Sequence, residues 1–183
     1  MAPAFNFLDR FSVAGNTRDR AFSHIKESCA VRGRKVLDIG CGTGTWSRLF
    51  QKEGAFVEAI DFAPKMIEIA KAENEGIDFK VAGADETSRY GSGEFDIVTS
   101  SFVLHDILEP ERKELLKEMN RIADLCIIFD YGGHVPLIPR LFEFFEGNRY
   151  RNFLINIRSE LNELIGDPEI VDLENGGALY ICR

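Results

Sequence analysis

Short apolar runs alternate with amphipathic stretches along the first two thirds of the chain. Each apolar run ends at glycine or polar residues, as buried strands do. The expected strands are residues 35–39, 55–60, 77–81, 95–99 and 125–129. The expected helices between them are residues 44–53, 64–72 and 110–122, with one short helix between the third and fourth strands. This alternation predicts a parallel sheet with helices on both faces.

The two ends of the chain follow other patterns. The first thirty residues have a helical and partly apolar pattern, and residues 135–165 carry two helical patterns. Near the C-terminus, short apolar segments at 169–173 and 178–182 flank Asn175-Gly176, a sequence that favours a hairpin. The predicted fold class is therefore α/β: a doubly wound, mostly parallel seven-stranded sheet with a C-terminal antiparallel hairpin.

Composition and charge narrow the function classes. A chain of 183 residues suits a single domain that needs no disulfide or metal to support its core. Its 30 acidic residues outnumber 22 basic ones, for a net charge of -8, which argues against nucleic acid as a partner. No apolar run approaches the ~20 residues of a membrane span and no secretory signal is visible, so we expect a cytoplasmic protein with no membrane partner. The four cysteines form no CxxC pair, and we expect no metal site.

The most informative segment is a glycine-rich turn at residues 36–44, with the sequence VLDIGCGTG. Its three glycines allow the backbone to turn sharply and approach a ligand closely. A dinucleotide-binding fingerprint would need a further glycine where Thr45 stands. The carboxylate of Asp38 would repel a pyrophosphate at this turn and attract a cationic group instead. The turn is therefore expected to bind a ligand that carries a positive charge.

This turn and the segments that follow it resemble the class I S-adenosylmethionine-dependent methyltransferases, in their small-molecule, methyltransferase-domain 11-like branch. The resemblance is good over residues 30–131 and loose elsewhere. It implies a Rossmann-like methyltransferase fold, S-adenosylmethionine as cofactor and a small-molecule methyl acceptor. We expect a single methyltransferase domain, 1–183, that comprises an N-terminal helical cap at 1–30, a cofactor-binding core at 31–131, a helical substrate-cap insert at 134–166 and a terminal hairpin at 168–183.

The resemblance assigns cofactor-binding roles to residues at the strand ends. Asp38 would orient the amino group of the cofactor, and Asp61 would accept hydrogen bonds from both ribose hydroxyls. Asp61 has a second interpretation, as a residue that caps the helix beginning near Pro64. Asp85 lies one position past the place where the family has an acid that binds adenine, so either Asp85 or another acceptor serves there. The expected cofactor-binding residues are Asp38, Gly40, Cys41, Gly42, Gly44, Asp61, Phe62, Met66, Asp85, Glu86, Ser100 and Ser101.

The candidate catalytic residues follow the fourth and fifth expected strands. Methyl transfer from a sulfonium is an in-line displacement, so a base is needed only if the acceptor loses a proton. His105 is the first candidate, with simple packing or capping in its turn as the alternative, and Tyr131 and His134 are the others. Aromatic residues are dense in residues 135–165, which suits an apolar or aromatic acceptor, a helix core or the interface of a homodimer.

Three functions therefore stay open, and the favoured one is given first. The first is methyl transfer from S-adenosylmethionine to a small molecule. The second is a catalytically silent S-adenosylmethionine-binding or protein-interaction module of the same fold, which the displaced third acid and the uncertain base leave open. The third is a nicotinamide-dependent enzyme on a related sheet, and Asp38 and Thr45 count against it.

Overall fold

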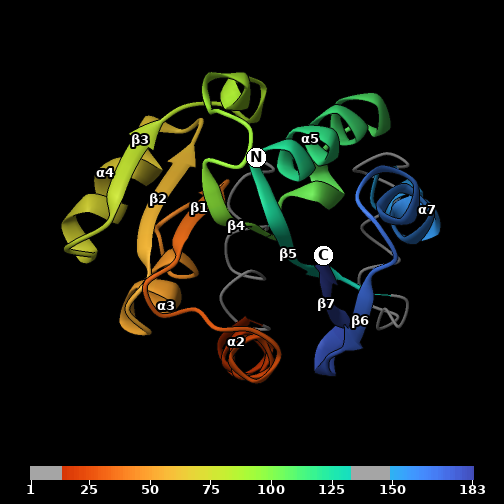
Figure 1. Ribbon diagram of the computed structural model, residues 1–183, viewed down its shortest axis with the longest axis horizontal. Coiled ribbons are helices and arrows are strands. Elements are labelled where there is room, and N and C mark those ends of the chain that lie inside the picture. Colours follow the sequence, from red (N-terminus) through yellow and green to blue (C-terminus); the bar gives the residue numbers. More distant parts are fainter. Residues whose placement is uncertain (1–13, 133–148) are drawn as a thin grey trace, which may run out of the picture.

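The computed structural model describes residues 14–132 and 149–183, and a single seven-stranded sheet forms its centre (Figure 1). The strands are β1 (Lys35–Ile39), β2 (Phe56–Asp61), β3 (Asp78–Val81), β4 (Phe95–Ser101), β5 (Ala123–Tyr131), β6 (Glu169–Asp172) and β7 (Gly177–Cys182). Their order across the sheet is β3-β2-β1-β4-β5-β7-β6. The pairs among β1 to β5 are parallel, whereas β7 runs antiparallel to both β5 and β6. The predicted fold class is confirmed.

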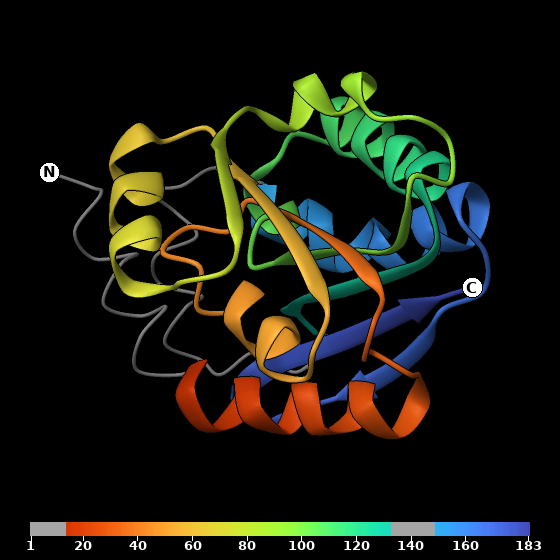
Figure 2. The same cartoon turned by 60° about the vertical axis from the view of Figure 1, so that its left-hand side comes forward.

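Helices cover both faces of this sheet. The α-helices are α2 (Ala14–Ser28), α3 (Ser47–Lys52), α4 (Pro64–Glu73), α5 (Glu109–Ile122) and α7 (Arg149–Leu164). The single-turn or short 3-10 helices are η1 (Ala84–Arg89), η2 (Leu104–Asp106) and η3 (Glu174–Gly176). Figure 2 shows α2 running along one face, where it shares a core with α3, while α5 and α7 pack on the other face.

The alternation of side chains along β1 shows how the two cores are separated. Val36 joins the apolar cluster under α2 and α3, whereas Leu37 and Ile39 join the cluster under α5 and α7. Asp38 follows the parity of Val36 and therefore points toward α3. The fold thus places one acidic side chain of the glycine-rich segment inside the α3 side of the core.

Several boundaries differ from the sequence-based expectation by one to three residues. The helix expected at 44–53 begins only at Ser47, because the residues before it form the positive-φ turn that ends at Gly44. Strands β4 and β5 each extend two residues further toward their carboxyl ends than expected. The hairpin of β6 and β7 is confirmed, but a 3-10 turn connects its strands in place of a two-residue turn. The first helical pattern expected within 135–165, like His134, lies outside the described residues.

Candidate active site

The glycine-rich turn lies at the carboxyl end of β1, where the order of strands in the sheet reverses between β1 and β4. Gly40, Gly42 and Gly44 have φ angles of 74°, 56° and 76°, a left-handed conformation that other residues rarely adopt. The N–H groups of Gly40 and Cys41 both donate to the carbonyl of Ile60, at 2.8 and 3.0 Å. The turn is therefore fixed to the end of β2 by its own backbone.

Asp61 is the last residue of β2 and faces this turn. Its Oδ2 accepts a hydrogen bond from the N–H of Gly42 at 2.8 Å, and its Oδ1 accepts one from the N–H of Ala63 at 2.9 Å. A carboxylate offers about four lone-pair sites, so two backbone bonds leave room for two further donors. The bond to Ala63 supports the entry into α4, as a cap would, and the bond to Gly42 ties the carboxylate to the turn. Both sequence-based interpretations of Asp61 are therefore compatible with its geometry.

Asp38 lies completely buried beneath the turn. The hydroxyl of Ser47 donates to its Oδ2 at 2.5 Å, whereas Oδ1 has no hydrogen-bond partner among the described residues. Burial raises the pKa of Asp38 to about 7; the Ser47 hydrogen bond opposes this rise, the charge of Asp61 adds to it, and Arg18 opposes it. A buried carboxyl oxygen without a donor is a place where an added N–H group or a positive charge would be stabilised.

A cavity of about 210 Å³ opens in front of the turn. Its lining residues are Arg18, Gly40, Cys41, Gly42, Thr43, Thr45, Trp46, Asp61, Phe62, Ala63, Met66, Ser101 and Phe102. Seven of the expected cofactor-binding residues are among them. The structure therefore brings together residues from α2, the turn, the end of β2 and the end of β4.

Three further residues of this cavity wall are Arg18, Trp46 and Phe102. Arg18 brings a positive charge from α2, and no motif marks it because α2 meets the turn only through tertiary packing. The indole N–H of Trp46 donates to the Thr99 hydroxyl at 2.9 Å, which fixes the ring at the base of the cavity wall. Phe102 is the one described non-glycine residue with a positive φ, 54°, and such backbone strain clusters at functional sites.

A second cavity of about 910 Å³ continues from the first and shares Gly40, Asp61 and Phe62 with it. Phe62 is 79% exposed between the two cavities, so its ring offers an apolar face to a ligand there. Asp85 lines the second cavity from η1. Glu86 does not line it; its carboxylate accepts a hydrogen bond from the Gly83 N–H at 3.0 Å and pairs with Arg89.

Three other expected cofactor residues lie outside both cavity walls: Asp38, which is buried beneath the turn, Ser100 and Gly44. Ser100 is completely buried within β4, and its hydroxyl has no hydrogen-bond partner among the described residues. Gly44 packs against the ring of Phe79 and shapes the turn from below. The contribution of Ser100 and Gly44 to any ligand contact would be indirect.

His105 and Asp130 form a close pair beside the first cavity. Nδ1 of His105 lies 2.8 Å from Oδ1 of the completely buried Asp130, and Nε2 lies 3.3 Å from Oδ1 of Asp106. Asp130 also accepts from the backbone N–H groups of Leu104 and Tyr131. Since a carboxylate only accepts hydrogen bonds, Nδ1 of His105 carries a proton toward Asp130.

Aromatic rings surround the imidazole of His105. Tyr131 meets it edge to face at 4.8 Å between ring centres, and Phe102, Tyr150 and Phe153 do so at 6.3 to 6.4 Å. The structure thus brings His105 and Tyr131, two of the candidate catalytic residues, into contact. His105 itself does not line either cavity, and its side chain is 13% exposed.

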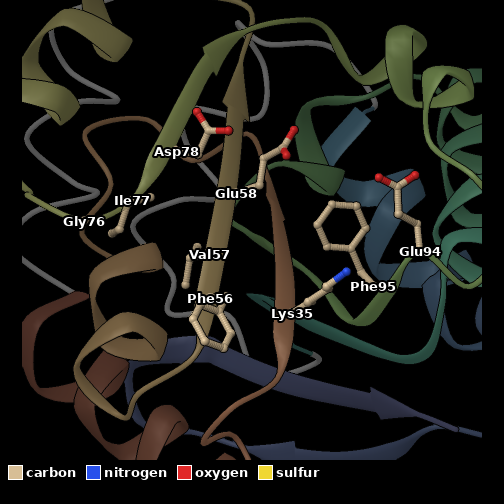
Figure 3. A pocket seen from close by; sticks show the side chains of 9 residues that line it. All are labelled: Lys35, Phe56, Val57, Glu58, Gly76, Ile77, Asp78, Glu94 and Phe95. Atoms are coloured by element: carbon tan, nitrogen blue, oxygen red, sulfur yellow. The ribbon is translucent and has the colours of Figure 1, made fainter.

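A third hollow, of about 530 Å³, lies at the opposite edge of the sheet. Figure 3 shows Lys35, Phe56 and Phe95 in its wall, and each of them begins a strand. Ligands of doubly wound sheets bind at the carboxyl ends of the strands, so this hollow lies away from the candidate site.

Two further features concern residues 14–132 and 149–183. Within these ranges, no group of three His, Cys, Asp or Glu side chains is placed to hold a metal ion. No helix of the described part is long and apolar enough to span a membrane.

Comparison with known proteins identifies the domain. Residues 36–124 match the methyltransferase-domain family. A demethylmenaquinone methyltransferase of Renibacterium salmoninarum is 34% identical over 67% of this chain and 51% of its own length. Residues 36–124 therefore form a methyltransferase domain. A ubiquinone biosynthesis O-methyltransferase of Aromatoleum aromaticum is 34% identical over 47% of this chain and 38% of its own length.

A solved structure supports the fold of the chain over nearly its whole length. Magnesium protoporphyrin IX methyltransferase from Synechocystis PCC 6803, with bound SAH, superposes with a TM-score of 0.72 at 18% identity and covers 98% of this chain and 95% of its own. The curated relatives are longer, and the chain spans about half of the length of the demethylmenaquinone enzyme. Their substrates are therefore evidence for a proposal and not an assignment.

The residues present fit S-adenosylmethionine. The Oδ1 atom of buried Asp38 has no hydrogen-bond partner among the described residues and would stabilise a positively charged group such as an ammonium. The carboxylate of Asp61 retains two acceptor sites for the vicinal hydroxyls of a ribose. A Cβ at Gly40 would lie 2.4 Å from Cγ2 of Val103, so the turn can approach that wall only as glycine. The charged and hydrogen-bonding groups of the site and the space at Gly40 therefore fit the same ligand, S-adenosylmethionine.

Proposed function

We propose that this protein transfers the methyl group of S-adenosylmethionine to a small-molecule acceptor by in-line displacement. The observation that carries the proposal is the position of Asp61. Its carboxylate is fixed by the N–H groups of Gly42 and Ala63 at the junction of the two cavities, with acceptor sites left for a ribose. The family match over residues 36–124 supports the same activity.

The roles of the other cofactor residues follow from their places. Asp38 stabilises the positive end of the ligand from beneath the turn, and Arg18 offers a partner for its carboxylate from α2. Phe62 and Met66 pack against the adenine side. S-adenosylmethionine supplies an already activated methyl group, so these residues mainly orient it and exclude water. Asp85 is the expected acceptor for the adenine amine.

His105 is the proposed base for an acceptor that loses a proton. Its Nδ1 is held by Asp130, which fixes the tautomer and leaves Nε2 as the basic atom. Once Nε2 has taken the proton from the acceptor, it can donate to the half-exposed carboxylate of Asp106, 3.3 Å away, which passes the proton to solvent. Tyr131 and His134 stay as the alternative catalytic residues, and His134 lies outside the described ranges.

An aromatic or quinone-type ring is the proposed acceptor class. Two relatives are named for demethylmenaquinone and for ubiquinone biosynthesis, respectively. Aromatic side chains of Phe102, Tyr131 and Tyr150 surround the candidate base, and flat rings pack well against such walls.

We also propose a cytoplasmic location and no nucleic-acid acceptor, in line with the net charge of -8. Whether the enzyme acts as a homodimer is decided by its sedimentation velocity.

A methyl-transfer assay tests the proposal. The protein is incubated with S-adenosylmethionine that carries a labelled methyl group and with a panel of catechols, phenols and hydroquinones. Label in an extracted ring product, absent with Asp61→Ala, is the expected result. Cofactor binding without label transfer to any acceptor, including an extract of small metabolites, would favour the silent module, and nothing in the comparisons favours that module.

A further inference from the structure

Arg112 is a completely buried cation at the junction of α5 and α7. Its Nε and Nη2 donate to the two carboxylate oxygens of Glu160 on α7, each at 2.7 Å. Nη2 also donates to Oδ1 of Asn152 at 2.8 Å, and Nη1 donates to the carbonyl of Ile107 at 3.0 Å. One guanidinium therefore joins α5, α7 and the end of the η2 turn.

Both ends of this network lead to His105. Ile107 lies two residues after His105 in the same short turn, so the bond from Arg112 fixes the backbone that carries the imidazole. On the other side, the guanidinium lies 5.7 Å from the ring centre of Phe153, and this ring in turn meets the imidazole edge to face at 6.4 Å. The same side chain thus sets the turn under His105 and the α7 wall beside it.

The chemistry of the Arg112–Glu160 pair favours a role in positioning nearby residues over a role in merely holding α5 against α7. A buried ion pair between two helices is often replaced by apolar residues of similar volume without loss of stability. Only the planar fork of arginine reaches a bidentate carboxylate, an amide oxygen and a backbone carbonyl together; the ammonium of a lysine cannot do so. The geometry of Arg112 is therefore specific in a way that packing α5 against α7 does not require.

We propose that Arg112 is a positioning residue for the candidate base: it holds the η2 turn and α7 in one register, so that His105 stays bonded to Asp130 inside its aromatic wall. This inference rests on the proposed function for its meaning in catalysis. It concerns the geometry of His105, however, and can be tested without an acceptor.

The test compares imidazole signals in variants of the whole chain. Arg112→Met/Glu160→Met removes both charges together and leaves no unpaired charge behind. Lys117→Met, which removes an exposed cation of the same helix, is the matched control. The chain has three histidines, so long-range ¹H–¹⁵N spectra resolve their rings, and single His→Gln variants assign them. The quantity measured is the exchange of the His105 Nδ1 proton with water.

In the double variant, we expect this exchange to become about tenfold faster, because the turn opens more often when its carbonyl anchor is lost. The signals of His24 and the S-adenosylmethionine affinity should stay unchanged, since Arg112 lines neither cavity. Unchanged His105 exchange in a folded double variant would overturn the proposal. If the double variant does not fold, Arg112→Lys decides in the same way, because it keeps the charge and loses the fork.

Failure of this inference is distinguishable from failure of the proposed function. A wild-type protein that does not bind S-adenosylmethionine would contradict the proposed function and leave the His105 measurement valid. Normal cofactor binding with His105 exchange insensitive to Arg112 would contradict only the positioning role.

Discussion

Gly42 and Gly44 have the same left-handed backbone and differ in their surroundings, so alanine at each position separates strain from ligand contact. A Cβ at Gly44 would lie 2.6 Å from Cζ of Phe79 and 3.0 Å from Nδ2 of Asn74. A Cβ at Gly42 would meet nothing within 4 Å, and Gly42 lines the cavity in front of the turn. Gly44→Ala should therefore destabilise the fold, whereas Gly42→Ala should weaken ligand binding.

The magnitudes follow from these contacts. Left-handed φ costs an alanine about 1–2 kcal/mol, and alanine stiffens the unfolded chain enough to offset about 0.4–1 kcal/mol of that. Gly42→Ala should then lower the free energy of unfolding by about 1 kcal/mol. Gly44→Ala adds the overpacking of Phe79, about 1–3 kcal/mol, for a total of roughly 2–4 kcal/mol. For a chain of this size each kcal/mol lowers Tm by about 2–4 °C.

Urea unfolding and calorimetric titration of both variants provide the assay. Gly44→Ala should have the lower unfolding midpoint, whereas Gly42→Ala should stay folded and bind S-adenosylmethionine about tenfold more weakly, a loss of about 1.4 kcal/mol. Equal loss of stability in the two variants, or full cofactor affinity in Gly42→Ala, would refute the steric reasoning.

Two further predictions concern buried charges. Burial raises the pKa of Asp38 from 3.8 to about 7. The Asp38 carboxyl therefore holds its proton more tightly in the folded protein than in the unfolded chain. The stability gained from this proton is lost as the pH rises from about 4 to about 7. Relative to Asp38→Asn, the wild type should lose up to about 1.4 kcal/mol of unfolding free energy per pH unit between pH 4 and 7, and identical urea midpoints of the two proteins across that range would contradict this. Arg112→Ala should cost about 3–5 kcal/mol because Glu160 is left buried and unpaired, while Lys65→Ala on exposed α4 should cost under about 1 kcal/mol; equal melting temperatures would count against the buried pair.

The strand pattern and the glycine-rich turn were predictable because both depend on local sequence. Apolar runs of five or six residues mark β1, β2 and β4, and the turn needs glycine wherever φ is positive. The start of α3 was placed three residues too early because Gly44 to Trp46 resemble a helix N-terminus in the sequence. In the structure, the positive φ of Gly44 keeps the turn open until Ser47.

The pairing of His105 with Asp130 was not predicted, although the sheet register contains it. Ser101 of β4 pairs with Phe129 of β5, so the residues after each strand end lie at the same edge. One sequence does not show which neighbour a strand-end carboxylate such as that of Asp130 meets. The contribution of Arg18 was equally hidden, since it depends on how α2 lies across the turn.

The central claim is that the carboxyl edge of this sheet binds S-adenosylmethionine through Asp61. Isothermal titration with S-adenosylmethionine and with its demethylated product measures this directly, with Asp78→Asn at the far end of β3 as the control for removal of an acid. We predict one site in the wild type and in Asp78→Asn, and affinity at least about tenfold lower in Asp61→Asn, which loses an acceptor for the ribose. No binding of either ligand by the wild type, or equal affinity in all three proteins, would contradict the claim.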